Sequence, residues 1–74
     1  MGAYTITHDN DGAFHVRGKR IEQFVAMTNF PSEGALLRFL NVIERIGLLN
    51  ALRRERKDTN LPVYIGKIRV DQYL

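Results

Sequence analysis

Residues 14–30 read FHVRGKRIEQFVAMTNF, and their hydrophobic period changes at Gly18. Before this glycine, Phe14 and Val16 alternate with polar residues, which predicts a half-buried strand. After it, apolar or small side chains recur at the spacing i, i+3, i+4, i+7 that marks one face of a helix: Ile21, Phe24, Val25 and Thr28. The stretch therefore predicts a strand followed at once by a helix.

A second alternating run precedes this strand. Tyr4 and Ile6 alternate with threonines, and the link from there to Phe14 contains an Asp-Gly pair that favours a turn. Pairing Tyr4 with Val16 and Ile6 with Phe14 would place all four side chains on one face. We therefore expect a β-hairpin in this register.

Two more helices are expected after the first. Asn29 or Ser32 can cap the second helix, which should run to about Ile46 with its buried stripe at Leu36, Phe39, Leu40 and Ile43. Gly47 should lie just beyond its end, since glycine commonly follows the last helical residue. Three leucines then predict a short third helix that ends in a basic run: Leu48, Leu49 and Leu52.

The segment Ile65-Gly66-Lys67-Ile68 predicts a second hairpin, because glycine at the first position of a two-residue loop suits a type II′ turn. This turn pairs Ile65 with Ile68 and Val63 with Val70 on one face, and Tyr64 with Arg69 on the other. Residues 1–74 then form a single α+β domain in the order ββ-ααα-ββ. We expect about four strands in a mostly antiparallel sheet, covered on one face by about three helices.

The chain carries a net charge of +3, and residues 53–74 hold the whole excess. Two basic clusters make up the candidate interaction surface: Arg53, Arg54, Arg56 and Lys57, and Arg17, Lys19 and Arg20. A basic run at the end of a helix has an ordinary explanation, since cations favour the negative end of the helix dipole. Contact with a polyanion is the alternative, and the two clusters would form one positive patch if the fold brought them together.

No stretch approaches the length of a membrane span, so no membrane association is expected, and the absence of cysteine fits a reducing compartment. Gly18-Lys19 lacks the remaining residues of a phosphate-binding loop, because Ala13 stands at the first glycine position and Arg20 at the hydroxyl position. We therefore expect no nucleotide site in this chain.

Metal sites are not expected either. Asp9-Asn10-Asp11-Gly12 resembles the start of a calcium loop, but no bidentate glutamate or flanking helices complete it, so a turn explains these residues. His8 and His15 are the only histidines, and neither lies at a zinc-ligand spacing. The sequence thus predicts no catalytic, cofactor-binding or metal-binding residues, and no enzyme activity for this chain by itself.

Across residues 4–73 the chain resembles the C-terminal domain of Obg-family GTPases. The residues that carry the resemblance are Phe14, Val16, Gly18, Ile21, Glu22, Met27, Thr28, Phe30, Glu33, Ala35, Leu36, Arg38, Phe39, Gly47, Ala51, Leu52, Val63, Tyr64, Ile65 and Gly66. Two positions depart from the family pattern. Asn60-Leu61-Pro62 replaces a Gly-Asp turn before the last hairpin, and Val70 replaces an aromatic residue in the last strand.

The resemblance implies a non-catalytic regulatory or interaction domain of a cytoplasmic bacterial protein. Such a parent protein has a glycine-rich domain and a central GTPase domain, which would hold the GTP and magnesium. It would take part in large ribosomal subunit assembly and in growth or stress control. The implied partners are the parent's own GTPase domain and the large ribosomal subunit. The alternative function is direct contact with ribosomal RNA through the basic run from Arg53 to Lys57.

Overall fold

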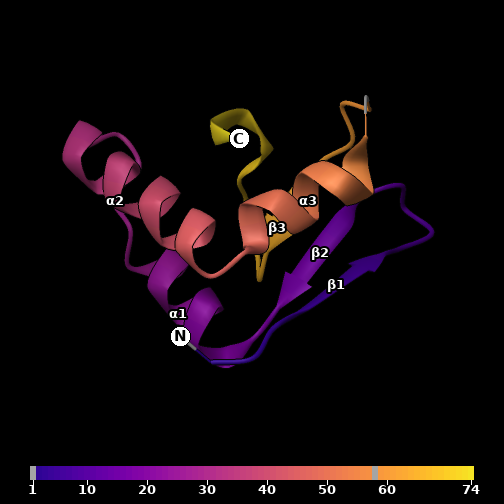
Figure 1. Ribbon diagram of the computed structural model, residues 1–74, viewed down its shortest axis with the longest axis horizontal. Coiled ribbons are helices and arrows are strands. Elements are labelled where there is room, and N and C mark those ends of the chain that lie inside the picture. Colours follow the sequence, from indigo (N-terminus) through magenta and orange to yellow (C-terminus); the bar gives the residue numbers. More distant parts are fainter. Residues whose placement is uncertain (1, 58) are drawn as a thin grey trace.

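The computed structural model describes residues 2–57 and 59–74, which fold in the predicted order ββ-ααα-ββ (Figure 1). The elements are β1 (Thr5–His8), β2 (Phe14–Arg17), α1 (Lys19–Ala26), α2 (Glu33–Arg45), α3 (Leu48–Arg56), β3 (Val63–Ile65), β4 (Ile68–Arg69) and a short 3-10 helix η1 (Asp71–Tyr73). None of the helices in this described part of the chain is long and apolar enough to cross a membrane.

The four strands form one sheet in the order β1-β2-β3-β4, and this sheet is mixed. The prediction of a mostly antiparallel sheet is wrong at its centre, because β2 and β3 are parallel, with Phe14 opposite Val63 and Val16 opposite Ile65. Each hairpin is antiparallel within itself. The three helices between β2 and β3 form a crossover connection long enough to return the chain in the same direction.

The register predicted for the first hairpin is also wrong, by two residues. Ile6 lies opposite Val16 and His8 lies opposite Phe14. Gly12 lies in the connecting turn, as expected, and its φ of 83° is the left-handed conformation that closes a three-residue loop, so the strands pair up to His8 and Phe14. Because the side-chain period of a strand is two, the slip leaves Ile6 and Val16 on the expected face.

The second hairpin has the predicted register, with Tyr64 opposite Arg69 and Ile65 opposite Ile68. Gly66 has a φ of 61° at the first loop position, as a type II′ turn requires. The Val70 N–H donates to the Val63 carbonyl at 2.8 Å and extends the pairing beyond the strand.

The change from strand to helix occurs at Gly18, as its sequence period indicates. A Cβ atom at this position would lie 2.7 Å from the Ala3 carbonyl oxygen, so only glycine allows these two segments of the chain to lie so close together. The carboxylate of Glu22 accepts the Gly18 N–H at 2.9 Å, and the Gly18 carbonyl accepts the Glu22 N–H at 2.9 Å. This reciprocal pair satisfies backbone groups at the start of α1.

The other two helices begin and end near their predicted residues. Ser32 caps α2, and its side chain accepts the Ala35 N–H at 3.4 Å. Gly47 lies between α2 and α3 with a φ of 83°, and it serves both as the residue beyond α2 and as the N-cap of α3. Glycine permits this left-handed conformation without a steric penalty.

All three helices cover the same face of the sheet. The buried side chains of the strands and of the helices form one core cluster: Phe14, Val16, Ile21, Val25, Phe39, Ile43, Leu48, Leu49, Leu52, Val63, Ile65 and Val70. Phe39 is fully buried and meets the Phe30 ring edge-on, with centroids 5.1 Å apart. Leu36 and Leu40 of the predicted α2 stripe are only partly buried and pack at the margin of this core.

Candidate interaction surfaces

The two predicted basic clusters lie at different ends of the molecule. Arg17, Lys19 and Arg20 are exposed at the junction of β2 and α1, whereas the basic run occupies the C-terminal end of α3. In Figure 1 the β2–α1 junction lies at the lower left and the C-terminal end of α3 lies at the upper right. The fold therefore does not join the clusters into one positive patch.

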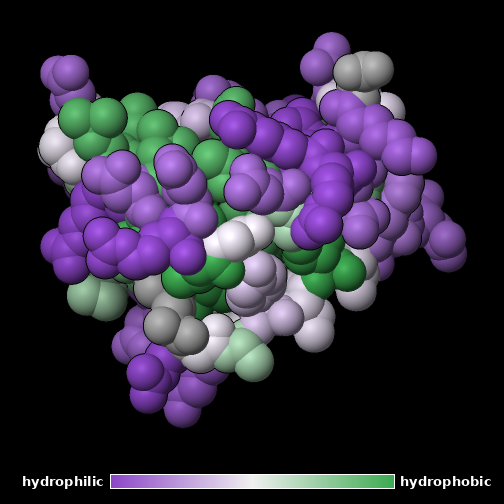
Figure 2. Space-filling view, viewed as in Figure 1, coloured by the Kyte–Doolittle hydropathy of each residue, from purple (hydrophilic) through white to green (hydrophobic). Residues whose placement is uncertain are grey.

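The basic run forms one face of α3 because its cations recur at helical spacing. Asn50, Arg53 and Arg54 follow the pattern i, i+3, i+4 and are exposed, and the exposed Lys57 follows as the C-cap residue of α3, with a φ of 53° that lies outside the helical range. Three leucines on the opposite side are buried: Leu48, Leu49 and Leu52. Figure 2 shows hydrophilic atoms gathered over α3. We call Arg53, Arg54 and Lys57 the α3 basic face.

Arg56 does not belong to this face, although the sequence groups it with the others. Its side chain is partly buried, and its Nε atom is buried without a hydrogen-bond partner among the described residues. It follows Leu52 by four positions and so turns toward the core side of α3. Three of the four predicted cations in this run are therefore available to a partner.

The charge of the α3 basic face is not neutralised within the described structure. Arg53, Arg54 and Lys57 form no ion pair with any residue in the ranges 2–57 and 59–74. A shallow hollow runs along this face, and its lining consists of Gly47, Asn50, Arg53 and Arg54. The last turn of a helix stabilises cations through its dipole, which explains their position without requiring a ligand. The same arrangement can bind the phosphates of a polyanion.

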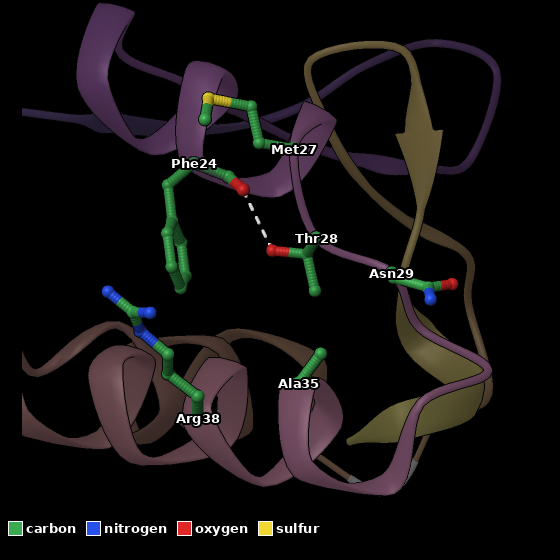
Figure 3. A pocket seen from close by; sticks show the side chains of 6 residues that line it. All are labelled: Phe24, Met27, Thr28, Asn29, Ala35 and Arg38. Atoms are coloured by element: carbon green, nitrogen blue, oxygen red, sulfur yellow. Dashed lines mark hydrogen bonds between the residues drawn. The ribbon is translucent and has the colours of Figure 1, made fainter.

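A second surface, which the sequence did not predict as a site, lies between α1 and α2. Six residues line a pocket of about 260 Å³: Phe24, Met27, Thr28, Asn29, Ala35 and Arg38. Figure 3 shows the Phe24 ring and the Arg38 side chain reaching toward each other from the two helices, while the Asn29 side chain points away. We call this pocket the α1–α2 groove.

The α1–α2 groove leaves a large apolar side chain in contact with solvent. Met27 is 78% exposed, and Leu37 on α2 is 55% exposed. Figure 2 shows hydrophobic atoms at the surface over α2. One sequence signal was present, because Met27 lies outside the predicted buried stripe of its helix. An exposed apolar side chain favours a binding surface where other apolar groups adjoin it, and Phe24 and Ala35 line the same groove as Met27.

A third cluster forms where the β1–β2 turn folds back on β2. Nε2 of His15 lies 3.1 Å from an Asp11 carboxylate oxygen and 3.5 Å from an Asp9 carboxylate oxygen. The Asp11 carboxylate also accepts the Ala13 N–H at 2.8 Å. This backbone hydrogen bond, followed by the hydrogen bond from His15, lowers the pKa of Asp11 below its ordinary value.

The three ligand-type atoms of this cluster lie within 4.8 Å of one another, a spacing that a metal ion requires. Binding through Nε2 of His15 would leave the proton on Nδ1, which is buried without a hydrogen-bond partner among the described residues. Histidine ligands normally donate that proton to an acceptor. The cluster is therefore better explained as a hydrogen-bonded turn, with the His15 ring packed against Tyr64 at a centroid distance of 5.3 Å.

Comparison with known proteins identifies relatives of the whole domain. Residues 4–71 match the family model described as a domain of unknown function (DUF1967). The protein named GTPase Obg from Staphylococcus haemolyticus (strain JCSC1435) is 44% identical over 50 residues, which is 68% of this chain. The GTPase Obg of Roseiflexus castenholzii (strain DSM 13941 / HLO8) is 37% identical over 68 residues, which is 92% of this chain.

These relatives are much longer proteins. The matched region covers 12% of the Staphylococcus haemolyticus protein and 15% of the Roseiflexus castenholzii protein. No solved structure matches the chain. The likeness therefore concerns one small domain of a large GTPase.

Proposed function

This chain belongs to the family of Obg C-terminal domains, and on that premise we propose that it is a non-catalytic regulatory and interaction module of an Obg-type GTPase. The relatives that carry this domain are named GTPase Obg, and the domain is a minor part of their length. The parent protein would be cytoplasmic and would act in large ribosomal subunit assembly and in growth or stress control.

The observation that carries this proposal is the exposed apolar surface at the α1–α2 groove. Met27 is 78% exposed beside a pocket, while twelve other side chains form a closed core. Exposed apolar groups that line a depression favour a protein contact, because the contact removes them from water. This surface therefore favours a function in protein binding.

Regulation would follow from a difference in affinity between the nucleotide states of the parent protein. The GTPase domain would hold GTP and magnesium, and this module would bind that domain more tightly in one state than in the other. Binding energies in such systems couple by about 1–3 kcal/mol, which corresponds to a change in affinity of about 5- to 150-fold. A contact of equal strength in both states would have no regulatory effect.

GTP turnover of the parent protein tests this function. We expect removal of the domain to change either the affinity for GTP or the turnover rate by about fivefold or more. Addition of the separate 74-residue chain should partly restore the original values. Identical GTP affinity and turnover with and without the domain would refute a regulatory role in the GTPase cycle.

A second function, contact with ribosomal RNA, is favoured by the α3 basic face. Arg53 and Arg54 lie on one side of α3, Lys57 follows at its C-cap, and these three exposed cations have no ion-pair partner among the described residues. Neutralising three phosphates predicts a slope of about −2 to −3 in a plot of log affinity against log salt concentration.

Matched variants test the RNA contact. The triple change Arg53→Ala, Arg54→Ala and Lys57→Ala should flatten the salt dependence of binding to a ribosomal RNA fragment. The control changes three cations at the other cluster: Arg17→Ala, Lys19→Ala and Arg20→Ala. An affinity that is independent of salt, or an equal loss in both triple variants, would refute recognition by the α3 basic face.

A further inference from the structure

The α1–α2 groove has a largely apolar lining, and the hydroxyl group in it is already bonded to the backbone. The Thr28 hydroxyl donates to the Phe24 carbonyl at 2.8 Å, and this bond faces the groove (Figure 3). The Met27 N–H also contacts this carbonyl, at 3.3 Å. The Phe24 ring, the Thr28 methyl group and Ala35 remain as surfaces that an apolar side chain can cover.

Among the described residues, Arg38 is the only charged one that lines the groove. Its side chain is exposed, and it forms no ion pair or side-chain hydrogen bond within residues 2–57 and 59–74. Figure 3 shows its guanidinium group at the side of the Phe24 ring. A guanidinium group binds a carboxylate through two parallel hydrogen bonds, and it has no such acceptor here.

We propose that the α1–α2 groove binds a peptide segment of the parent GTPase that presents an apolar side chain next to a carboxylate. This inference rests on the proposed function and names the chemistry of the partner. The apolar side chain would cover Phe24 and Met27, and the carboxylate would pair with Arg38. A volume of about 260 Å³ is below the range of about 300–1,000 Å³ for small-molecule pockets, so it suits one or two side chains.

Two observations favour a segment of the parent polypeptide as the occupant. The groove is small, and the related GTPases are much longer than this domain. The matched region covers only 12% and 15% of the two related GTPases, so most of such a polypeptide lies outside this domain. A single apolar contact and one ion pair bind weakly between separate molecules. A segment in the same polypeptide is present at an effective concentration in the millimolar range, which makes a weak contact effective.

The first experiment measures binding of two small probes to the 74-residue chain by NMR titration. The probes are N-acetyl-phenylalanine, which carries a free carboxylate, and its carboxamide. Both should shift the amide signals around the groove, and the carboxylate should bind three- to tenfold more tightly. Equal affinities for the two probes, or shifts confined to other surfaces, would overturn the proposal.

Three variants assign the effect to named groups. Arg38→Gln should abolish the preference for the carboxylate while the carboxamide binds as before, and Met27→Ser should weaken both probes. Arg45→Gln removes another exposed cation of α2 that does not line the groove, and it should change neither affinity. Loss of the preference in Arg45→Gln would overturn the role of Arg38. Self-association that Met27→Ser abolishes would identify a second copy as the occupant and would also overturn the proposal.

The same residue tested in the parent protein separates this inference from the proposed function. Arg38→Glu should change GTP turnover in the same direction as removal of the domain. If removal has an effect and Arg38→Glu has none, the regulatory function stands and the groove assignment fails. If neither has an effect, the regulatory function fails, and the probe titration alone decides what the groove binds.

Discussion

The α1–α2 groove and the α3 basic face belong to the same helical layer, yet they arise in different ways. The basic face is a property of one helix and its C-cap, since helical spacing places Arg53 and Arg54 opposite the buried leucines and Lys57 follows at the end of the helix. The groove exists only where α1 ends and α2 passes beside it, and it combines Phe24 with Arg38 across two helices. A charged face can thus be recognised from periodicity, whereas a groove depends on how helices pack.

The largest effect is expected from a substitution in the core that supports both surfaces. Phe39→Ala should lower the free energy of unfolding by about 3–5 kcal/mol, because its ring is fully buried and packs against Phe30. A domain of this size has little more stability than that, so most molecules should be unfolded. Urea denaturation followed by circular dichroism measures the effect. A cooperative transition at the original midpoint would show that the two surfaces do not share this support.

A smaller loss of stability is expected from a change in the β3–β4 turn, which contacts α1. Gly66→Ala should destabilise the domain by about 1–2 kcal/mol, because its φ of 61° is unfavourable for alanine. The added Cβ atom would also lie 2.9 Å from the Glu22 carboxylate of α1. Gly34→Ala is the control, since its Cβ meets no atom within 4 Å and alanine favours the helix. Equal melting temperatures for the two variants would contradict this account of the turn.

An ion pair next to the C-terminal hairpin should make the stability of the domain depend on pH without affecting either surface. The Arg69 guanidinium bonds to Asp71 at 2.8 and 3.2 Å and lowers the pKa of Asp71 below its ordinary value of 3.8, and the Val63 N–H adds to this effect. Because the folded pKa is the lower one, this stabilisation is complete above the unfolded pKa and is lost as the pH falls through the folded pKa.

Asp71→Asn should therefore cost about 0.5–1 kcal/mol at neutral pH and progressively less in acid. Denaturation measured over a series of pH values checks this expectation. Since Asp71 lines neither surface, probe binding at the groove and RNA binding at α3 should remain unchanged. A cost that stays constant down to the lowest pH would show that the ion pair is not its source.

The smallest effect is expected at the groove itself. Met27→Ser should change the free energy of unfolding by less than about 0.5 kcal/mol, because the side chain is 78% exposed. Val25→Ser, two residues earlier and fully buried, should destabilise the domain strongly. Thermal melts of the two variants make the comparison. A large loss of stability in Met27→Ser would mean that this side chain supports the fold and is not a free binding surface.

Much of the fold was predictable from local patterns. The change of period at Gly18, the buried positions of α2 such as Ile43 and the two-residue turn at Gly66 all correspond to elements of the structure. The role of the basic residues as an interaction surface stays a prediction; the structure leaves Arg53, Arg54 and Lys57 exposed and Arg56 partly buried. The groove was not predicted, because no period within one helix relates Arg38 of α2 to Phe24 of α1.

The kind, the order and the buried face of each main element can be derived from the amino-acid sequence, because they follow from periods of 2 and 3.6 residues within short segments. The sequence also determined the family, through the spacing of many ordinary packing residues. The parallel pairing of β2 with β3, and the groove that Phe24 and Arg38 share, could be found only in the folded molecule. Such contacts join segments that are distant in sequence or carried on separate helices. Their geometry depends on the packing of the complete core, which no local pattern contains.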